Sequence, residues 1–132
     1  MSVPGTKDFA VELYTNQLSG KLAITDINTD LLHKIVSKLA PISYDTESDS
    51  AYVSGNDQTE IETVRISLFT KHLGLNSVDD SEETAATKKE TQTAMIKAAI
   101  EKYGSSNPKK YRVPLIYIIL EDNSLTEDYL AL

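Results

Sequence analysis

The two histidines are the first residues to consider for chemistry, because a nucleophilic hydroxyl needs a base that a third group holds in place. His33 follows Asp30 by about one helical turn, a spacing at which a carboxylate can orient an imidazole. His72 precedes Leu73-Gly74 at the end of a predicted helix, where a partly charged imidazole interacts well with the terminal carbonyls. Neither histidine lies in a catalytic motif, so we predict structural roles for both and no enzyme activity.

An acidic loop is the second candidate site. Asp45, Glu47 and Asp49 are spaced two residues apart, as are the first three ligands of an EF-hand. The match ends there, because Ser50 stands at the position that needs glycine and Asn56 at the position that needs a bidentate glutamate. The chain has no cysteine and its five glycines are scattered, which excludes thiolate ligands and a glycine-rich phosphate loop. We therefore predict no metal and no cofactor.

A local excess of positive charge is the third candidate. Between residues 97 and 112 five cations stand against Glu101, in a chain of net charge −7. With Tyr103 and Tyr111 interleaved, such a patch can receive phosphates beside stacking rings, or an acidic protein partner. Ordinary solvation by helix-terminal lysines explains the same residues. The candidate partner-binding residues are Lys102, Asn107, Lys109, Lys110 and Arg112.

The composition bounds what must position these residues. At 132 residues, with 40% apolar and 25% charged side chains, the chain has the size and make-up of one globular domain with one core. The net negative charge opposes bulk binding to nucleic acids or anionic lipids. No signal-peptide pattern and no apolar run of about 18 residues occurs, so we expect a cytoplasmic protein that does not enter a membrane.

Apolar spacing and capping residues predict helices in the first half. Thr6 caps a short helix that ends near Ser19-Gly20, where glycine suits a left-handed terminus, within an N-terminal extension of residues 1–28. Asn28 or Thr29 caps a second, amphipathic helix that stops before Pro41. Residues 42–55 are rich in Ser and Asp and predict a loop, with a short hairpin as the alternative.

The third predicted helix begins at Asn56 or Asp57, where Glu60 supplies a capping box, and ends at Gly74. Residues 76–93 carry few large apolar groups and fit a solvated linker, an exposed helix start, or both. Helical periodicity then resumes and closes at Gly104.

The C-terminal part is harder to assign. Asn107-Pro108 predicts a helix start, with the proline at the first helical position. The apolar run from Val113 to Leu120 fits either a buried strand or a helix, and Pro114 would kink a helix that began at residue 108. The tail, residues 121–132, has Thr126 as a candidate cap and an apolar end that is expected to dock on the domain or on a partner.

Three segments of the chain resemble the bacterial family catalogued as domain of unknown function 2853. They are DLLHKIVSKLAPISY, NDQTEIETVRISLFTKHLGL and IEKYGSSNPKKYRVPLIYIIL, and the resemblance runs from Asp30 to Leu120. It implies an all-helical fold in which the run from Val113 to Leu120 is a helix buried on every side. Pro114 and the long acidic stretch from Asp79 to Glu83 depart from the family pattern. The family has no established activity, so the resemblance implies no mechanism.

Together these observations predict a single all-α domain, residues 1–132, built as a small bundle of about five helices. Its leading predicted function is non-enzymatic protein binding or self-association, through the apolar tail or the surface around Asn107 to Arg112. Nucleic-acid binding through the patch from Lys97 to Arg112 is the alternative.

Overall fold

The computed structural model describes residues 5–40, 42–46, 52–53, 58–104 and 110–132, and over these residues the chain is mainly helical. The α-helices are α1 (Lys7–Asn16), α2 (Thr29–Lys38), α3 (Gln58–Arg65), α4 (Glu82–Tyr103), α5 (Arg112–Asp122) and α6 (Thr126–Leu130). Two π-helical segments, η1 (Gln17–Lys21) and η4 (Ile66–His72), continue α1 and α3, and η2 (Ile42–Tyr44) is a 3-10 turn. The predicted all-α fold is confirmed.

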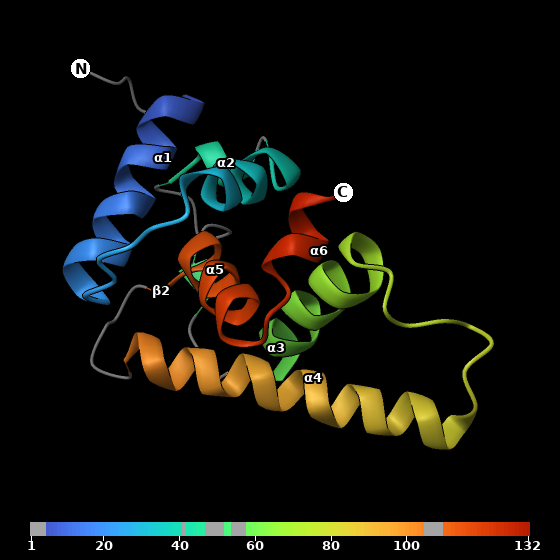
Figure 1. Cartoon of the computed structure of the whole chain (residues 1–132). Helices are drawn as coiled ribbons and strands as arrows, with labels where there is room; N and C mark the ends of the chain where they lie inside the picture. The colour runs from blue at the N-terminus through green and yellow to red at the C-terminus, as the bar shows by residue number, and fades with distance from the viewer. Residues whose placement is uncertain (1–4, 41, 47–51, 54–57, 105–109) are drawn as a thin grey trace.

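Helix α5 is the centre of the core. Every side chain from Val113 to Leu120 is buried, which an α-helix allows only when neighbours cover all its sides. Helices α2, α4 and α6 all contact it, and Figure 1 shows α4 running along one edge of the molecule with α1 and α2 toward the opposite edge. The helix predicted for this apolar run, in place of a strand, is confirmed.

The start of α5 differs from the prediction. Lys110 and Tyr111 form a strand, β2 (Lys110–Tyr111), so the helix begins at Arg112 and not at Pro108, which lies outside the described residues. Pro114 is then the third helical residue. An amide in the first turn has no acceptor within the helix, so the proline removes no helical hydrogen bond and the reason for a kink disappears.

Strand β2 pairs antiparallel with β1 (Tyr52–Val53), Tyr52 facing Tyr111 and Val53 facing Lys110. The extended part of the Ser/Asp-rich segment therefore pairs with a strand more than fifty residues away, and this pairing, unlike the alternative hairpin, joins the two halves of the chain. The rest of that segment, including residues 47–51 and the predicted caps Asn56 and Asp57, lies outside the described residues.

Most predicted helix ends are confirmed. The Thr6 hydroxyl accepts the Phe9 N–H at 3.3 Å, and the Asn28 side chain accepts the Leu31 N–H at 3.1 Å. Gly74 and Gly104 follow their helices with φ of 62° and 103°, a region that favours glycine. The left-handed residue after the first helix was predicted wrongly: it is Ala23, with φ 53°, because η1 carries the helical path past Gly20 to Lys21.

The C-terminal tail docks on its own domain. Helix α6 packs against α2, Tyr129 is fully buried, and the Lys34 ammonium group donates to the Leu132 carbonyl. Thr126 is the first residue of α6 and not its cap. Its hydroxyl donates to the Glu121 carboxylate at 2.9 Å. Over the described residues, no helix combines the length and the apolar character that crossing a bilayer requires.

Candidate interaction surface

The cations predicted to bind a partner lie in different surroundings. Lys102 is exposed, but its ammonium group contacts both carboxylate oxygens of Asp122 at 3.0 Å. Lys110 is only 5% exposed. Arg112 is partly buried, and its Nε atom is buried without a hydrogen-bond partner among the described residues. Asn107 and Lys109 lie outside the described residues. The structure therefore does not gather the described members of this set into one open cationic face.

The histidines occupy two unrelated places. His33 is exposed on α2. His72 is partly buried at the end of η4, with its ring edge-on to Tyr129 at a centroid distance of 6.0 Å and its Nδ1 atom 3.4 Å from the Tyr129 hydroxyl. Burial lowers the pKa of His72, and nearby Lys38 and Lys71 lower it further. The ring of His72 therefore packs on α6, and burial disfavours the charged form that was predicted to interact with the terminal carbonyls of the helix.

A pocket of about 530 Å³ adjoins Lys102, between the segment before α2, the end of α4 and α5. Its polar wall includes Asp26, Glu121 and the paired Lys102 and Asp122. The Tyr117 hydroxyl there accepts the Asn28 N–H at 2.8 Å, and burial is the main reason that the pKa of Tyr117 is raised. These groups offer hydrogen bonds and charge, and the described lining holds no histidine, serine or threonine.

Metal binding has no candidate in the part of the chain that the structure describes, where no three His, Asp or Glu side chains are grouped to hold an ion. Of the acidic loop that resembles the start of an EF-hand, Glu47 and Asp49 lie outside the described residues.

Helix α4 has two different halves. From Ser81 to Thr91 all side chains are exposed except Lys88, which is partly buried. From Gln92 onward the helix has a buried stripe at helical spacing, formed by Gln92, Ile96, Ala99 and Tyr103. The first half is thus an ordered, solvent-exposed helix that extends along the edge of the molecule, whereas the second half belongs to the core (Figure 1).

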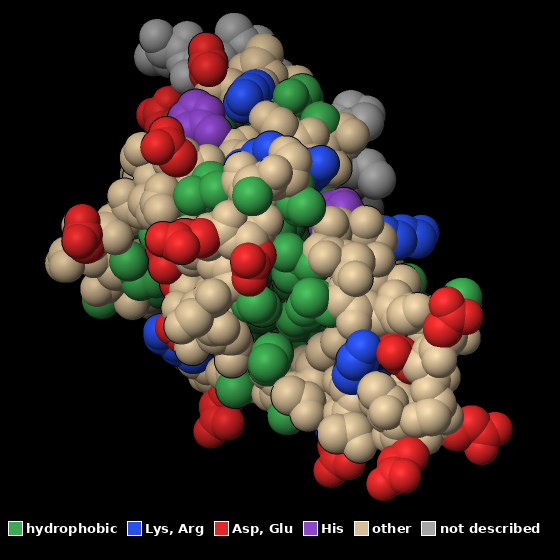
Figure 2. Space-filling model, turned by 45° about the vertical axis from the view of Figure 1, so that its right-hand side comes forward, with side chains coloured by type: hydrophobic (Ala, Val, Ile, Leu, Met, Phe, Trp, Pro, Cys, Tyr) green, Lys and Arg blue, Asp and Glu red, His purple; other side chains and the backbone are tan. Residues whose placement is uncertain are grey.

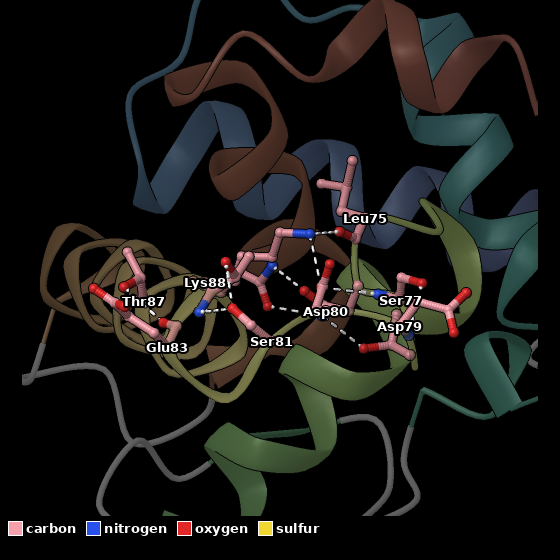
Figure 3. A network of polar contacts seen from close by, with 12 residues as sticks. Leu75, Ser77, Asp79, Asp80, Ser81, Glu83, Thr87 and Lys88 are labelled. Atoms are coloured by element: carbon pink, nitrogen blue, oxygen red, sulfur yellow. Dashed lines mark hydrogen bonds and ion pairs between the residues drawn. The ribbon is translucent and has the colours of Figure 1, made fainter.

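Polar contacts fix the exposed half at its start. The Ser81 hydroxyl caps α4 by accepting the Thr84 N–H at 3.1 Å. About two turns into the helix, Lys88 reaches back to the preceding loop, donating to the Leu75 carbonyl at 2.9 Å and to Asp80 at 2.8 Å (Figure 3). The hydrogen bond from Lys88 and a second one from the Ser77 N–H lower the pKa of Asp80. Loop and helix therefore hold each other in place.

A second polar network joins the same loop to α3 through Gln92, which is 5% exposed. The Gln92 and Asn76 side chains exchange two hydrogen bonds, at 2.8 and 3.0 Å, and Arg65 also donates to Gln92 at 3.4 Å. Arg65 makes two contacts with Glu62, at 2.9 and 3.0 Å, and its hydrogen bond is the main reason that the pKa of Glu62 is lowered. This network fixes the direction in which α4 leaves the core.

A groove of about 450 Å³ lies between Gln58, at the start of α3, and α4. The residues that α4 contributes follow the spacing of a single helix face, and we call them the α4 face: Ala86, Lys89, Glu90, Thr93, Ala94 and Lys97. Their side chains are small or long and charged, so a second helix can approach closely between the charges. The sequence prediction included only Lys97 in its basic patch. The overlooked signal was small and charged residues repeating at three- and four-residue steps.

Exposed apolar groups lie near the other end of this region. Leu75 is 42% exposed and Val78 is fully exposed in the loop before α4. Figure 2 shows hydrophobic side chains gathered in a hollow on the side of the molecule where α6 and the start of α4 come forward. The surroundings of α4 therefore offer both apolar and charged surface.

Comparison with known proteins gives one family. No curated protein matches the chain. A family model matches residues 13–127, which is most of the chain. The chain therefore belongs to the family described as protein of unknown function (DUF2853).

Proposed function

We propose that the protein is a non-enzymatic helical module that binds another protein chain through the α4 face. The observation that carries this proposal is the exposed first half of α4, which is held in a fixed position by polar contacts and not by burial. A helix that is polar on all sides gains little from packing on its own domain, and short isolated helices are marginal in water. Such a helix fits a role in which a partner supplies the missing contacts.

The order of the exposed half supports this role energetically. Each backbone residue that becomes fixed on binding costs about 1–2 kcal/mol of conformational entropy. The Ser81 cap and the contacts of Lys88 and Gln92 hold the helix before any partner arrives. A preorganised helix of this kind avoids much of the ordering cost, and docking of one helix face on another surface is a common mode of protein recognition.

The surfaces that the sequence predicted as docking sites are less accessible in the structure than the α4 face. The apolar tail is a poor docking site, since Tyr129 is fully buried and α6 is packed on α2. Around Arg112, the side chain of Lys110 is buried as well. The α4 face is open by comparison, because Ala86, Ala94 and Lys97 are all exposed.

A photo-crosslinking residue at Ala94, introduced into the chain in its native cell, tests the proposal. We expect covalent adducts with a second polypeptide after illumination, because position 94 lies on the α4 face. The matched control places the same residue at Ser37, which is exposed on α2 toward the opposite edge of the molecule. Absence of adducts at position 94, or equal adducts at both positions, contradicts the proposal.

A further inference from the structure

We infer that the partner of the α4 face is the α4 face of a second copy of this chain, with the two helices antiparallel. This inference rests on the proposed function and adds the identity of the partner. It comes from the order of charges along α4. Lys89, Glu90 and Lys97 of the α4 face lie along one side of the helix with Glu82, which is one turn before Ala86. The series begins with a negative charge at Glu82 and ends with a positive charge at Lys97. In its middle, the positive Lys89 stands next to the negative Glu90.

Twofold symmetry imposes a strict condition on such a pair: if residue i faces residue j, then j also faces i. With the symmetry axis between Lys89 and Glu90, Lys89 of each copy faces Glu90 of the other. The same register places Glu82 opposite Lys97 on both ends. Two copies of each pair give four pairs of opposite charge.

Small side chains occupy the positions between these charges. In the same register Ala86 faces Thr93, again twice, so that the helices can approach closely between the charged pairs. No like charges face each other among the α4 residues that line the groove. The four charged residues sum to zero on this face, although the whole chain carries −7, so local attraction is not opposed by the charges of the face itself.

The four charged groups on this side of α4 are available to a partner. Glu82, Lys89, Glu90 and Lys97 are all exposed. The ammonium group of Lys89 is 3.9 Å from Glu62, at the outer limit of an ion pair, and 59% of its side chain remains exposed. Glu62 is already bonded through both oxygens to Arg65. For Lys97, no ion pair is present among the described residues.

The size of the contact sets its expected strength. The helix segment from residue 82 to residue 97 spans about 22 Å at the usual rise per residue. A contact of that length buries less surface than a standard stable interface of about 800 Å² per partner. We therefore expect a weak dimer whose population depends on protein concentration.

Sedimentation velocity over a range of concentrations tests the inference with paired charge reversals. The substitutions Lys97→Glu and Glu82→Lys each place like charges opposite each other twice, and each is expected to weaken the dimer at least about tenfold. The double variant restores opposite charges and is expected to return the dimerisation constant to within about threefold of the original. Lys38→Glu, an exposed reversal on α2, is the matched control and should leave dimerisation unchanged.

Circular dichroism of each variant checks that the fold is kept, which is expected because Lys38, Glu82 and Lys97 are all exposed. A chain that stays monomeric at about 1 mM, or a double variant that fails to recover, overturns the inference. The crosslinks at Ala94 separate the two proposals. Adducts of twice the chain mass support the second copy, whereas adducts with other proteins alone overturn it and leave the proposed function standing.

Discussion

Gln92 is the residue at which α4 changes from an exposed helix into a core helix. A buried amide is stable only when its polar atoms are hydrogen-bonded, and here Asn76 bonds both the oxygen and the nitrogen of Gln92 while Arg65 donates to the oxygen. The same three side chains join the loop, α3 and α4. One satisfied amide thus holds the helix on which both proposals depend.

The first prediction concerns His72 and the dependence of stability on pH. Its folded-state pKa lies below the ordinary value of 6.5, chiefly because of burial and then because of Lys38 and Lys71. As pH falls below about 6.5 the unfolded chain therefore binds more protons than the folded chain, and acid favours unfolding. We expect the free energy of unfolding to decrease between pH 7 and pH 5, by less than about 1.4 kcal/mol per pH unit, the limit for one proton.

Urea denaturation at several pH values measures this effect. His72→Gln should flatten the dependence of stability on pH between 7 and 5, whereas His33→Gln, at an exposed site on α2, should leave it as steep as in the unchanged chain. Asp80 and Glu62 also have lowered pKa values, so they add a loss of the same sign, but at a more acidic pH. An unchanged slope in His72→Gln would show that the imidazole is not the cause.

Sequence alone was a good guide to those residues that act through their immediate neighbours. Thr6, Asn28, Gly74 and Gly104 end helices by contacts within a few residues, so composition and spacing locate them. Lys110 is different. Its burial follows from a strand pairing with residue Val53, and no local pattern carries that information.

Among the elements, α5 shows how context decides between helix and strand. The run from Val113 to Leu120 is rich in β-branched residues, and its own preference is for a strand. Burial by α2, α4 and α6 on all sides overrides that preference. The error at the start of the helix had a physical source: Pro108 suits a first helical position, but Lys110 and Tyr111 are used in a strand.

For helix α4, the sequence predicted the second half but left the first half open. Its second half has a buried stripe at helical spacing, which any periodicity analysis finds. Its first half has no apolar stripe, so a solvated linker and an exposed helix were equally compatible with residues 76–93. The Ser81 cap and the hydrogen bonds from Lys88 to Asp80 and Leu75 stabilise the helix in this half. The bonds from Lys88 depend on the path of the loop, which the sequence pattern does not reveal.

The cap of α4 provides the second prediction. Ser81→Ala removes the acceptor for the Thr84 N–H and is expected to cost about 1 kcal/mol. Because this half of the helix is not buried, the loss should appear locally, as faster amide hydrogen exchange in residues 82–88, with little change further along. If the α4 face binds a second copy, the same substitution also weakens dimerisation.

Thr87→Ala is the matched control for that experiment. Thr87 is exposed in the same half of α4, and its hydroxyl donates to the Glu83 carbonyl of its own helix. Alanine has the higher helix propensity, so exchange should stay the same or become slower. Equal protection in Ser81→Ala and in the unchanged chain would mean that the loop contacts of Lys88 suffice to hold the helix.

For the whole molecule, the C-terminal residues complete the core and are not a free extension. Tyr129 is fully buried and contacts the ring of His72, while Lys34 of α2 donates to the Leu132 carbonyl. Helix α6 thereby joins α2 to the end of η4, and burial raises the pKa of the Tyr129 hydroxyl. The sequence predicted a docked tail but left open whether it docks on the domain or on a partner.

The last prediction uses substitutions at Tyr129 to distinguish effects on stability from effects on association. Tyr129→Ala removes a large buried ring and should lower the free energy of unfolding by about 3–5 kcal/mol, whereas Leu132→Ala, at a side chain 41% exposed, should change it by less than about 1 kcal/mol. Tyr129→Phe keeps the ring, loses only the hydroxyl near His72, and should cost about 1 kcal/mol. If α4 is the docking surface, folded Tyr129→Phe dimerises like the unchanged chain while Lys97→Glu does not. The reverse result would place association at the tail.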